Sequence, residues 1–375
     1  MKLYEHQAKD VFAKAGIPIP RGILAVDEAQ AEAAGETIGY PCVAKAQVLS
    51  GGRGKAGLIR LARGQAQLKE AAKTIFAAPQ KVRLLLIEEA VDFENEIYLA
   101  VTADPAGGGA LLLACAEGGI DIEELARTAP EKILKTHVPL SESLMPFRAR
   151  DLAYSLGFSG EKAKQFAAIA QSLYAVFRAQ DAELAEINPL FAVKSGGFVA
   201  GDGKLSVDDN SLNLHPEWEP QAGDFDSETA FEAYKEGIPY LQFDGDISLM
   251  CAGAGLTTTV YDLIADAGGT VANYLEFGGP NYRKGLKAME LCVRNNPKVI
   301  LIVTFGTIAR ADVMAEGIVS AMAALKPPCL IVTCIRGTGE EDAAKTLAAA
   351  GLDPLVDTEK AVKRAVEFSR SGGRP

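Results

Sequence analysis

The chain has 375 residues, 48% hydrophobic and 23% charged, which is ordinary for a globular protein and enough for two or three domains. Its formal net charge of −11 argues against general binding to nucleic acid or to an anionic membrane, because both need a basic surface. No apolar run approaches membrane-spanning length, and the charged start MKLYEHQAKD lacks the apolar core of a signal peptide. Six scattered cysteines without a Cys-x-x-Cys pair exclude a zinc or redox motif, so we expect reduced thiols and a cytoplasmic location.

A glycine-rich loop at residues 47–57, QVLSGGRGKAG, is the first distinctive stretch along the chain. The run CVAKAQVL before it predicts a strand, and LIRLAR after it predicts a second strand rather than the helix that a dinucleotide-binding motif requires. No P-loop pattern is present either. A glycine-rich loop between two strands can cover nucleotide phosphates, with charge from Arg53 and Lys55 and with Lys45 on the preceding strand. The alternative is a flexible, solvated hairpin tip, and the loop alone favours neither.

Residues 85–104 predict two further strands. The first ends at Glu88, and Glu96 lies in the second. A carboxylate or a backbone group just past a strand can bind an adenine amine or ribose hydroxyls. Composition alone supports such a role for these residues only weakly.

Residues 182–210 predict a hairpin whose turn is centred on the SGG that begins at Ser195. Glu186 and Asn188 are two residues apart, so they point to one face of their strand. Asn188 and Asp202 each lie seven residues from Ser195, and we expect them to face one another to within one residue of register. Oxygen ligands in this arrangement suit Mg²⁺, which takes one or two protein ligands plus phosphate oxygens. The alternative is a set of polar residues on an exposed face.

From about residue 245, short apolar runs alternate with helical patterns, which predicts a parallel sheet wrapped by helices. Four glycine-containing loops, CAGAG, EFGGPN, TFGT and IRGTGEE, each follow a predicted strand and precede a helix. Such loops meet at the carboxyl edge of the sheet, where helix N-termini suit a small carboxylic acid or a phosphohistidine loop. Tight strand-to-helix turns are the alternative explanation of the glycines.

The two halves are joined by residues 213–240, which hold Trp218, prolines and acids without a strong period and predict a linker. We therefore expect a nucleotide-binding domain at 1–235, with a subdomain at about 21–100 that carries the glycine-rich loop. A second domain is expected at 240–375.

The motifs together resemble the β subunit of succinyl-CoA synthetase. Over residues 2–215 they appear in family order as LYEHQAKDVFAKAGIPIPRG, KAQVLSGGRGKAG, AEGGIDIEELA, EINPL and GDGKLSVDDNSL. The second half resembles the family's ligase domain less tightly, with CAGAGL, NYLEFGG and FGTIARADVMAEGI. The resemblance implies an α/β protein, with an N-terminal ATP-grasp domain followed by a flavodoxin-like, doubly wound parallel-sheet domain. It also implies the reversible reaction acid + CoA + NTP = acyl-CoA + NDP + phosphate, with Mg²⁺ as cofactor.

The resemblance also implies roles for individual residues. The family's nucleotide-binding positions are occupied here by Lys45, Gly52, Arg53, Gly54, Glu88, Val91 and Glu96. Its magnesium ligands correspond to Asn188 and Asp202, and Glu186 matches a glutamate close to a phosphohistidine during phosphoryl transfer. ATP and GTP remain equally open as the nucleotide.

The acid pocket departs from the family pattern. Ala252 replaces a substrate-facing asparagine, and Thr307 fills a glycine position before Ile308 and Ala309. Arg336 stands where the family usually has an acidic residue. ATP-citrate lyase and citryl-CoA synthetase vary the same loops. The departures predict a small di- or multi-anionic acid other than, or besides, succinate.

The chain has three histidines, His6, His137 and His215, none of them beside a glycine loop, and all three are expected to lie at the surface. In the family, the phosphohistidine and the main CoA site belong to a separate α subunit, so we expect such a partner. Two other functions remain open: a stand-alone ATP-grasp carboxylate–amine ligase, and a nucleotide-sensing subunit without catalysis.

Overall fold

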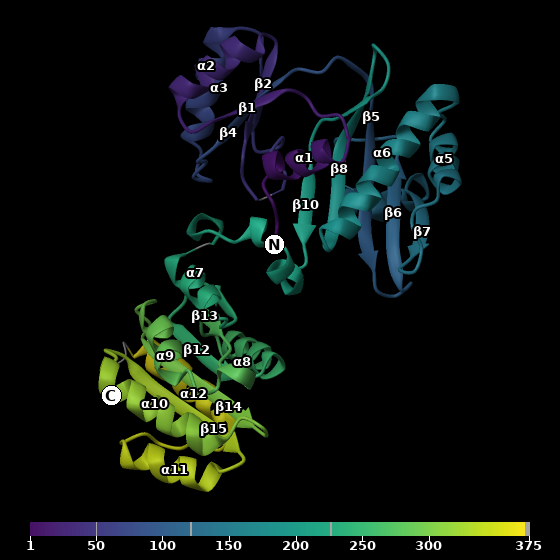
Figure 1. Ribbon diagram of the computed structural model, residues 1–375. Coiled ribbons are helices and arrows are strands. Elements are labelled where there is room, and N and C mark those ends of the chain that lie inside the picture. Colours follow the sequence, from purple (N-terminus) through teal and green to yellow (C-terminus); the bar gives the residue numbers. More distant parts are fainter. Residues whose placement is uncertain (50, 121, 226, 372–375) are drawn as a thin grey trace. The chain divides into compact units, whose positions relative to one another are not determined.

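The computed structural model describes residues 1–49, 51–120, 122–225 and 227–371. Its contacts divide the chain into two units, Met1–Glu219 and Pro220–Pro375 (Figure 1). The division falls inside the stretch 213–240 that was expected to be the linker. Helix α7 (Glu228–Lys235) packs on strand β11 (Tyr240–Gln242) and so belongs to the second unit, although the first domain was expected to extend to residue 235. Among the described residues, no helix is both long and apolar enough to cross a membrane.

The first unit begins with a small antiparallel sheet in the order β1-β4-β2-β3. Its elements are β1 (Gly22–Ala25), α2 (Glu28–Ile38), β2 (Cys42–Ala46), β3 (Ile59–Ala62), α3 (Gln65–Phe76) and β4 (Leu85–Glu89). Apolar side chains of α2 and α3 share one core with the strands, so both helices cover the same face (Figure 1). The prediction of a strand rather than a helix after the glycine-rich loop is confirmed, because β2 and β3 pair directly.

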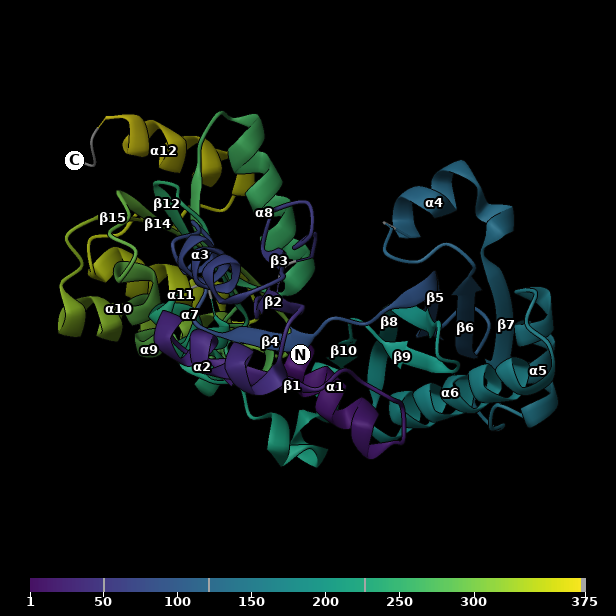
Figure 2. The ribbon, with the colours of Figure 1, turned by 90° about the horizontal axis from the view of Figure 1, so that it is seen from above.

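A second sheet in the order β10-β8-β5-β6-β7, with β9 also on β8, completes the first unit. The strands are β5 (Phe93–Asp104), β6 (Gly109–Cys115), β7 (Leu134–Pro139), β8 (Ala182–Val193), β9 (Phe198–Ala200) and β10 (Lys204–Val207). The helices are α1 (Glu5–Lys14), α4 (Ile122–Thr128), η1 (Pro130–Lys132), α5 (Pro146–Ser155), α6 (Gly160–Ala179), η2 (Asp209–Leu214) and η3 (Pro216–Trp218). Helices α1, α5 and α6 pack on one face, and α4 with η1 packs on the other (Figure 2).

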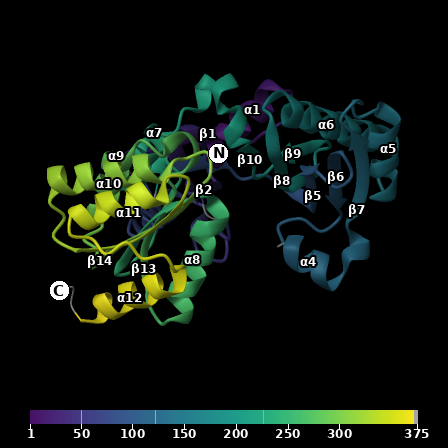
Figure 3. The same cartoon turned by 90° about the horizontal axis from the view of Figure 1, so that it is seen from below.

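The second unit is a five-stranded sheet between two layers of helices (Figure 3). Its strands are β11 (Tyr240–Gln242), β12 (Ile247–Ala252), β13 (Val271–Leu275), β14 (Val299–Gly306) and β15 (Leu330–Gly337). Its helices are η4 (Ala222–Asp224), α7 (Glu228–Lys235), α8 (Ala254–Asp266), η5 (Gly279–Asn281), α9 (Gly285–Val293), α10 (Ala311–Leu325), α11 (Glu340–Ala349) and α12 (Thr358–Arg370).

The strand order of this sheet is β11-β13-β12-β14-β15, with all neighbours parallel except β11. A parallel bridge from Thr333 to Pro354 extends the order beyond β15. The order confirms the flavodoxin-like prediction, and the antiparallel edge strand β11 is an addition to it.

Candidate active site

The glycine-rich loop is a flap that connects the antiparallel strands β2 and β3. Gly52 has a φ of 75° and Gly57 a φ of 70°, values in the left-handed region that favours glycine. Gly54 has an ordinary φ and open space around it, so neither backbone conformation nor packing explains a glycine there. Lys45 lies in β2, just before the flap, and its side chain is buried.

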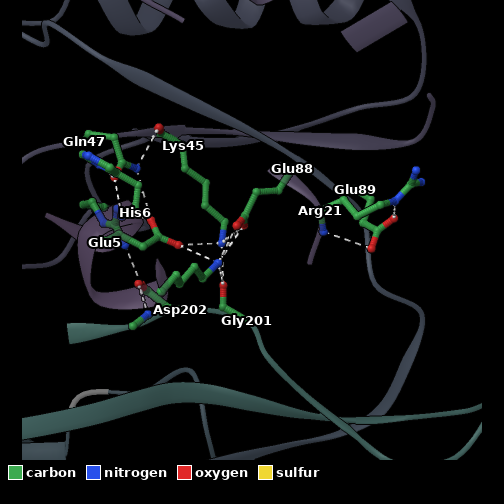
Figure 4. A network of polar contacts seen from close by, with 12 residues as sticks. Glu5, His6, Arg21, Lys45, Gln47, Glu88, Glu89, Gly201 and Asp202 are labelled. Carbon is green, nitrogen blue, oxygen red and sulfur yellow. Dashed lines mark hydrogen bonds and ion pairs between the residues drawn. The ribbon is translucent and has the colours of Figure 1, made fainter. Parts of the chain in front are cut away.

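The ammonium of Lys45 lies in a buried network of charges (Figure 4). Its Nζ lies 2.9 Å from a Glu5 carboxylate oxygen and 2.7 Å from one of Glu88, and it donates to the Gly201 carbonyl at 2.5 Å. Arg53 reaches down from the flap and places its guanidinium nitrogens 2.5 Å from Glu5 and 2.6 Å from Asp202. The network therefore joins α1, the small sheet, the flap and the second hairpin.

The charges of this network support one another. Burial acts to raise the pKa of Glu5, but Lys45, Lys9 and Arg53 outweigh it and hold that pKa well below the usual range. Burial likewise acts to lower the pKa of Lys45, but Glu5, Glu88 and Asp202 outweigh it and the pKa is raised. Lys45 and Glu5 are therefore held in their charged forms.

Asn188 and Asp202 face one another across the second hairpin. Two backbone pairs flank Asn188 along β8: Leu190 pairs with Ala200, and Glu186 pairs with Lys204. Both pairs have the same register, and this register places Asn188 opposite Asp202. The expected facing geometry is thus confirmed. The Asn188 side-chain oxygen accepts from the Gly119 amide at 2.7 Å, and one Asp202 oxygen accepts from the Gly203 amide at 2.7 Å.

Glu186 shares a face of β8 with Asn188, as expected, and this is the face opposite α6. The Tyr98 hydroxyl donates to its carboxylate at 3.1 Å, and Lys204 lies 3.8 Å away. Burial raises the pKa of Glu186, although Lys204 and Tyr98 oppose the change.

Glu186→Gln is expected to stabilise the chain near neutral pH. A carboxyl whose pKa is higher in the folded than in the unfolded state loses stability as pH rises above the unfolded value of about 4.5. The neutral amide avoids this loss, so the melting temperature of the variant should exceed that of the native chain at pH 7. The difference should shrink as pH falls towards 4.5. The melting temperatures of the variant and of the native chain are measured from pH 4.5 to pH 8. If the advantage of the variant is smaller at pH 7 than at pH 4.5, the raised pKa of Glu186 is contradicted.

The other predicted nucleotide positions lie at the junction of the two sheets. The carboxylate of Glu88 is buried against Lys45, so it is not free for a ligand. Val91 lies in the short link between β4 and β5. Glu96, in β5, lies against the loop at Gly119, where an added Cβ would come within 2.5 Å of the carboxylate, and burial raises its pKa.

Sequence reasoning missed two members of the buried network, Glu5 and Lys9. Both lie in α1, within the LYEHQAK stretch, and their i, i+4 spacing is typical of a helical ion pair. The i, i+4 spacing could have predicted the ion pair between these two residues, but it does not indicate that the pair is buried.

In the second unit, the four glycine-containing loops lie at the carboxyl edge of the sheet, as expected. An added Cβ on Gly278 would come within 3.1 Å of the Ala252 Cα, so the loops after β12 and β13 touch. One on Gly337 would come within 1.8 Å of the Gly306 carbonyl oxygen, so the loops after β14 and β15 also touch. Thr307 is exposed at this edge, and Ile308 is 94% exposed.

Ala252 and Arg336 lie on different faces of this sheet. Ala252 packs with the layer of α9, α10 and α11. Cys334, two residues before Arg336, packs with α8 and α12, and strand alternation directs Arg336 to that side. Its guanidinium donates to Glu340 at 2.9 Å and to the Val356 carbonyl at 2.7 Å.

Comparison with known proteins agrees with this architecture. Residues 2–192 match the model of the ATP-grasp domain, and residues 250–368 match that of the CoA-ligase domain. The ADP-forming sulfoacetate-CoA ligase subunit SauC of Bilophila wadsworthia is 55% identical over 98% of this chain and 99% of its own length. The β subunit of ADP-forming succinate–CoA ligase of Roseiflexus sp. is 38% identical, over 99% and 100% respectively.

The chain belongs to the ATP-grasp family of ADP-forming CoA-ligase subunits. It is therefore a subunit of an acid–thiol ligase that uses ATP or ADP with CoA. The ATP citrate lyase of Methanothrix soehngenii has the same fold, with a TM-score of 0.77 at 21% identity over 98% of this chain and 99% of that one. Family membership excludes the stand-alone carboxylate–amine ligase and the non-catalytic sensor.

Proposed function

We propose that this chain is the nucleotide-binding β subunit of a ligase that converts sulfoacetate, CoA and ATP into sulfoacetyl-CoA, ADP and phosphate. The observation that carries the proposal is the 55% identity with the sulfoacetate-CoA ligase subunit, against 38% with a succinate–CoA ligase β subunit, both over nearly the whole chain. The departures from the family pattern at Ala252, Thr307 and Arg336 also favour an acid other than succinate.

The flap and the network beneath it would hold the nucleotide phosphates. Lys45 and Arg53 supply positive charge from β2 and from the flap. Gly52 and Gly54 have no side chain, so the backbone amide groups of the flap could approach phosphate oxygens closely. This role would account for the glycine at position 54. We assign the adenosine end to Glu88, Val91 and Glu96 at the junction of the sheets. Because the Glu88 carboxylate is bound by Lys45, Glu88 would contact the nucleotide through its backbone.

Magnesium fits the second hairpin. Asn188 and Asp202 offer an amide and a carboxylate oxygen from facing positions, the hard oxygen donors that Mg²⁺ takes beside phosphate oxygens. A bound ion would neutralise the charge that develops on the transferred phosphoryl group. Glu186 lies on the same face, where we propose that it meets the partner's phosphohistidine.

The phosphohistidine and the main CoA site are proposed to lie on an α subunit. Two histidine rings of this chain are hydrogen-bonded: His6 lies 3.1 Å from Gln47, and His215 lies 2.9 Å from Asp181. His137 is exposed, and its ring lies 3.8 Å from Asp104. The expectation that His215 lies at the surface is wrong, because that residue is only 7% exposed. We also propose a cytoplasmic location, because none of the six cysteines forms a disulfide.

Labelling with γ-³²P-ATP tests this division of labour. The chain alone should acquire no stable phosphohistidine, whereas the complex with its α subunit should carry an acid-labile label on the partner. A stable phosphohistidine on this chain alone contradicts the proposal.

The acid is proposed to bind at Ala252, Thr307, Ile308 and Ala309, with Arg336 at the same edge. Replacement of an asparagine by Ala252 frees volume for a tetrahedral sulfonate, and Thr307 adds a hydroxyl. Because Glu340 already pairs with Arg336, the acid would compete with Glu340 for that guanidinium.

Ala252→Asn combined with Thr307→Gly is expected to shift specificity towards succinate. A polar group left without its partner discriminates strongly between substrates, so the ratio of kcat/KM for sulfoacetate over succinate should fall by about tenfold or more. The double variant is compared with the native two-subunit enzyme in an ADP-release assay. An unchanged ratio shows that these two positions do not select the acid.

A further inference from the structure

Lys9 lies at the centre of the buried network but has no role in the function proposed so far. Its ammonium donates to both oxygens of Glu88, at 2.6 and 2.8 Å, and to the Gly201 carbonyl at 2.8 Å. It also lies 3.0 Å from the Glu5 carboxylate, and only 2% of its side chain is exposed. Lys9 is therefore held between two carboxylates and is not presented to a ligand.

The network balances three cations against three carboxylates. The cations are Lys9 from α1, Lys45 from β2 and Arg53 from the flap, and the carboxylates are Glu5, Glu88 and Asp202. The neutral side chain of Gln47 also contacts Glu5 and His6. In a buried setting such a balance matters, because one uncompensated charge is strongly destabilising.

Nucleotide phosphates would disturb this balance. They compete with Glu5 and Glu88 for Lys45, and with Glu5 and Asp202 for Arg53. Once both cations turn to phosphate, the two glutamates keep Lys9 as their cation. Without Lys9, the uncompensated negative charge of Glu5 and Glu88 would retain Lys45 and Arg53 and so oppose their binding to phosphate.

We propose, on the basis of the nucleotide-binding function above, that Lys9 is a positioning residue: it neutralises Glu5 and Glu88 so that Lys45 and Arg53 can bind nucleotide phosphates. Burial and the neighbouring Lys45 lower the pKa of Lys9, against the opposite effect of Glu5 and Glu88. Movement of Lys45 towards a phosphate would remove one of the two lowering influences. Lys9 would then hold its proton more firmly at the stage when its charge is needed.

Titration calorimetry of the full chain with Mg·AMP-PNP tests the proposal. Lys9→Met should weaken binding by about tenfold or more, because the two glutamates then retain Lys45 and Arg53. Lys14→Met removes an exposed lysine from the same helix and should leave the affinity unchanged. Lys9→Arg keeps the charge and should therefore bind more tightly than Lys9→Met.

Glu5 supplies a second, oppositely directed measurement. Glu5→Gln removes the carboxylate that competes for Lys45 and Arg53, so this variant should bind Mg·AMP-PNP more tightly than the native chain. Lys9→Met in the Glu5→Gln background should then cause a smaller loss, because only the Glu88 carboxylate is left without its cation, and this pair remains measurable even if Lys9→Met alone fails to fold. Lys9→Met should also take up a proton as it binds nucleotide, which makes the binding enthalpy depend on the ionisation enthalpy of the buffer.

Two results overturn the inference about Lys9 without touching the proposed function. The first is a native affinity for Mg·AMP-PNP in Lys9→Met. The second is an equal loss of affinity from Lys9→Met with and without Glu5→Gln, and no proton uptake, which would leave Lys9 a purely structural role. A native chain that binds no Mg·AMP-PNP would instead overturn the proposed function, and the inference with it.

Discussion

Asp202→Asn is expected to lower kcat for acyl-CoA formation by about 10³-fold, the scale seen when one group that stabilises transition-state charge is removed. The substitution keeps size and shape but removes the charge of the proposed metal ligand on the second hairpin. The fold should survive, because 28% of the side chain is exposed, the Gly203 amide still finds an oxygen at this position, and Arg53 keeps Glu5 as its buried partner. The measurement is ADP release by the two-subunit enzyme over a range of Mg²⁺ concentrations.

The matched control is Asp208→Asn, at the other end of β10. The side chain of Asp208 accepts from the Asn210 amide, which an asparagine oxygen can also do, so no change in kcat is expected. If Asp202→Asn is folded and turns over at the native rate at ordinary Mg²⁺, then Asp202 is not a metal ligand.

Lys45→Met should weaken both nucleotide binding and the fold. It leaves the buried Glu88 carboxylate with Lys9 alone, and Glu5 with Lys9 and Arg53. The loss of one partner from a buried ion pair costs about 3–5 kcal/mol. The same ammonium is proposed to bind phosphate, so affinity for Mg·AMP-PNP should also be lost. Urea denaturation and calorimetry of the full chain measure the two effects separately.

Lys69→Met provides the contrast. Its ammonium pairs with Glu32 at 3.0 Å on the surface, and its side chain is 62% exposed, so the loss should be about 1 kcal/mol or less. Equal unfolding free energies for Lys45→Met and Lys69→Met would show that the network contributes no more than a surface ion pair.

The local parts of the site could be predicted from the sequence. The punctuated run after Gly57 indicated a strand instead of a helix, which identified a flap. The SGG turn fixed the register that sets Asn188 against Asp202, because a hairpin register follows from its turn. In the second unit, apolar runs of strand length between helical patterns were sufficient for a parallel sheet.

The contacts between distant segments could not be predicted in the same way. Glu5 and Lys9 have the spacing of an ordinary surface pair on a helix, and only tertiary packing buries them against β2, β4 and the second hairpin. His215 lies in a polar stretch, but it is buried and pairs with Asp181. The opposite orientations of Ala252 and Arg336 depend on the relative register of β12, β14 and β15, which no local pattern encodes.

The ratio of kcat/KM for sulfoacetate over succinate tests the central claim most directly. It is measured by ADP release with the native two-subunit enzyme, in the presence of saturating ATP, Mg²⁺ and CoA. A pocket that hydrogen-bonds one anion and leaves polar groups unpaired with the other discriminates by about 100-fold or more, so we expect sulfoacetate to be favoured by at least that ratio. A native enzyme that uses succinate as well as, or better than, sulfoacetate would contradict the account.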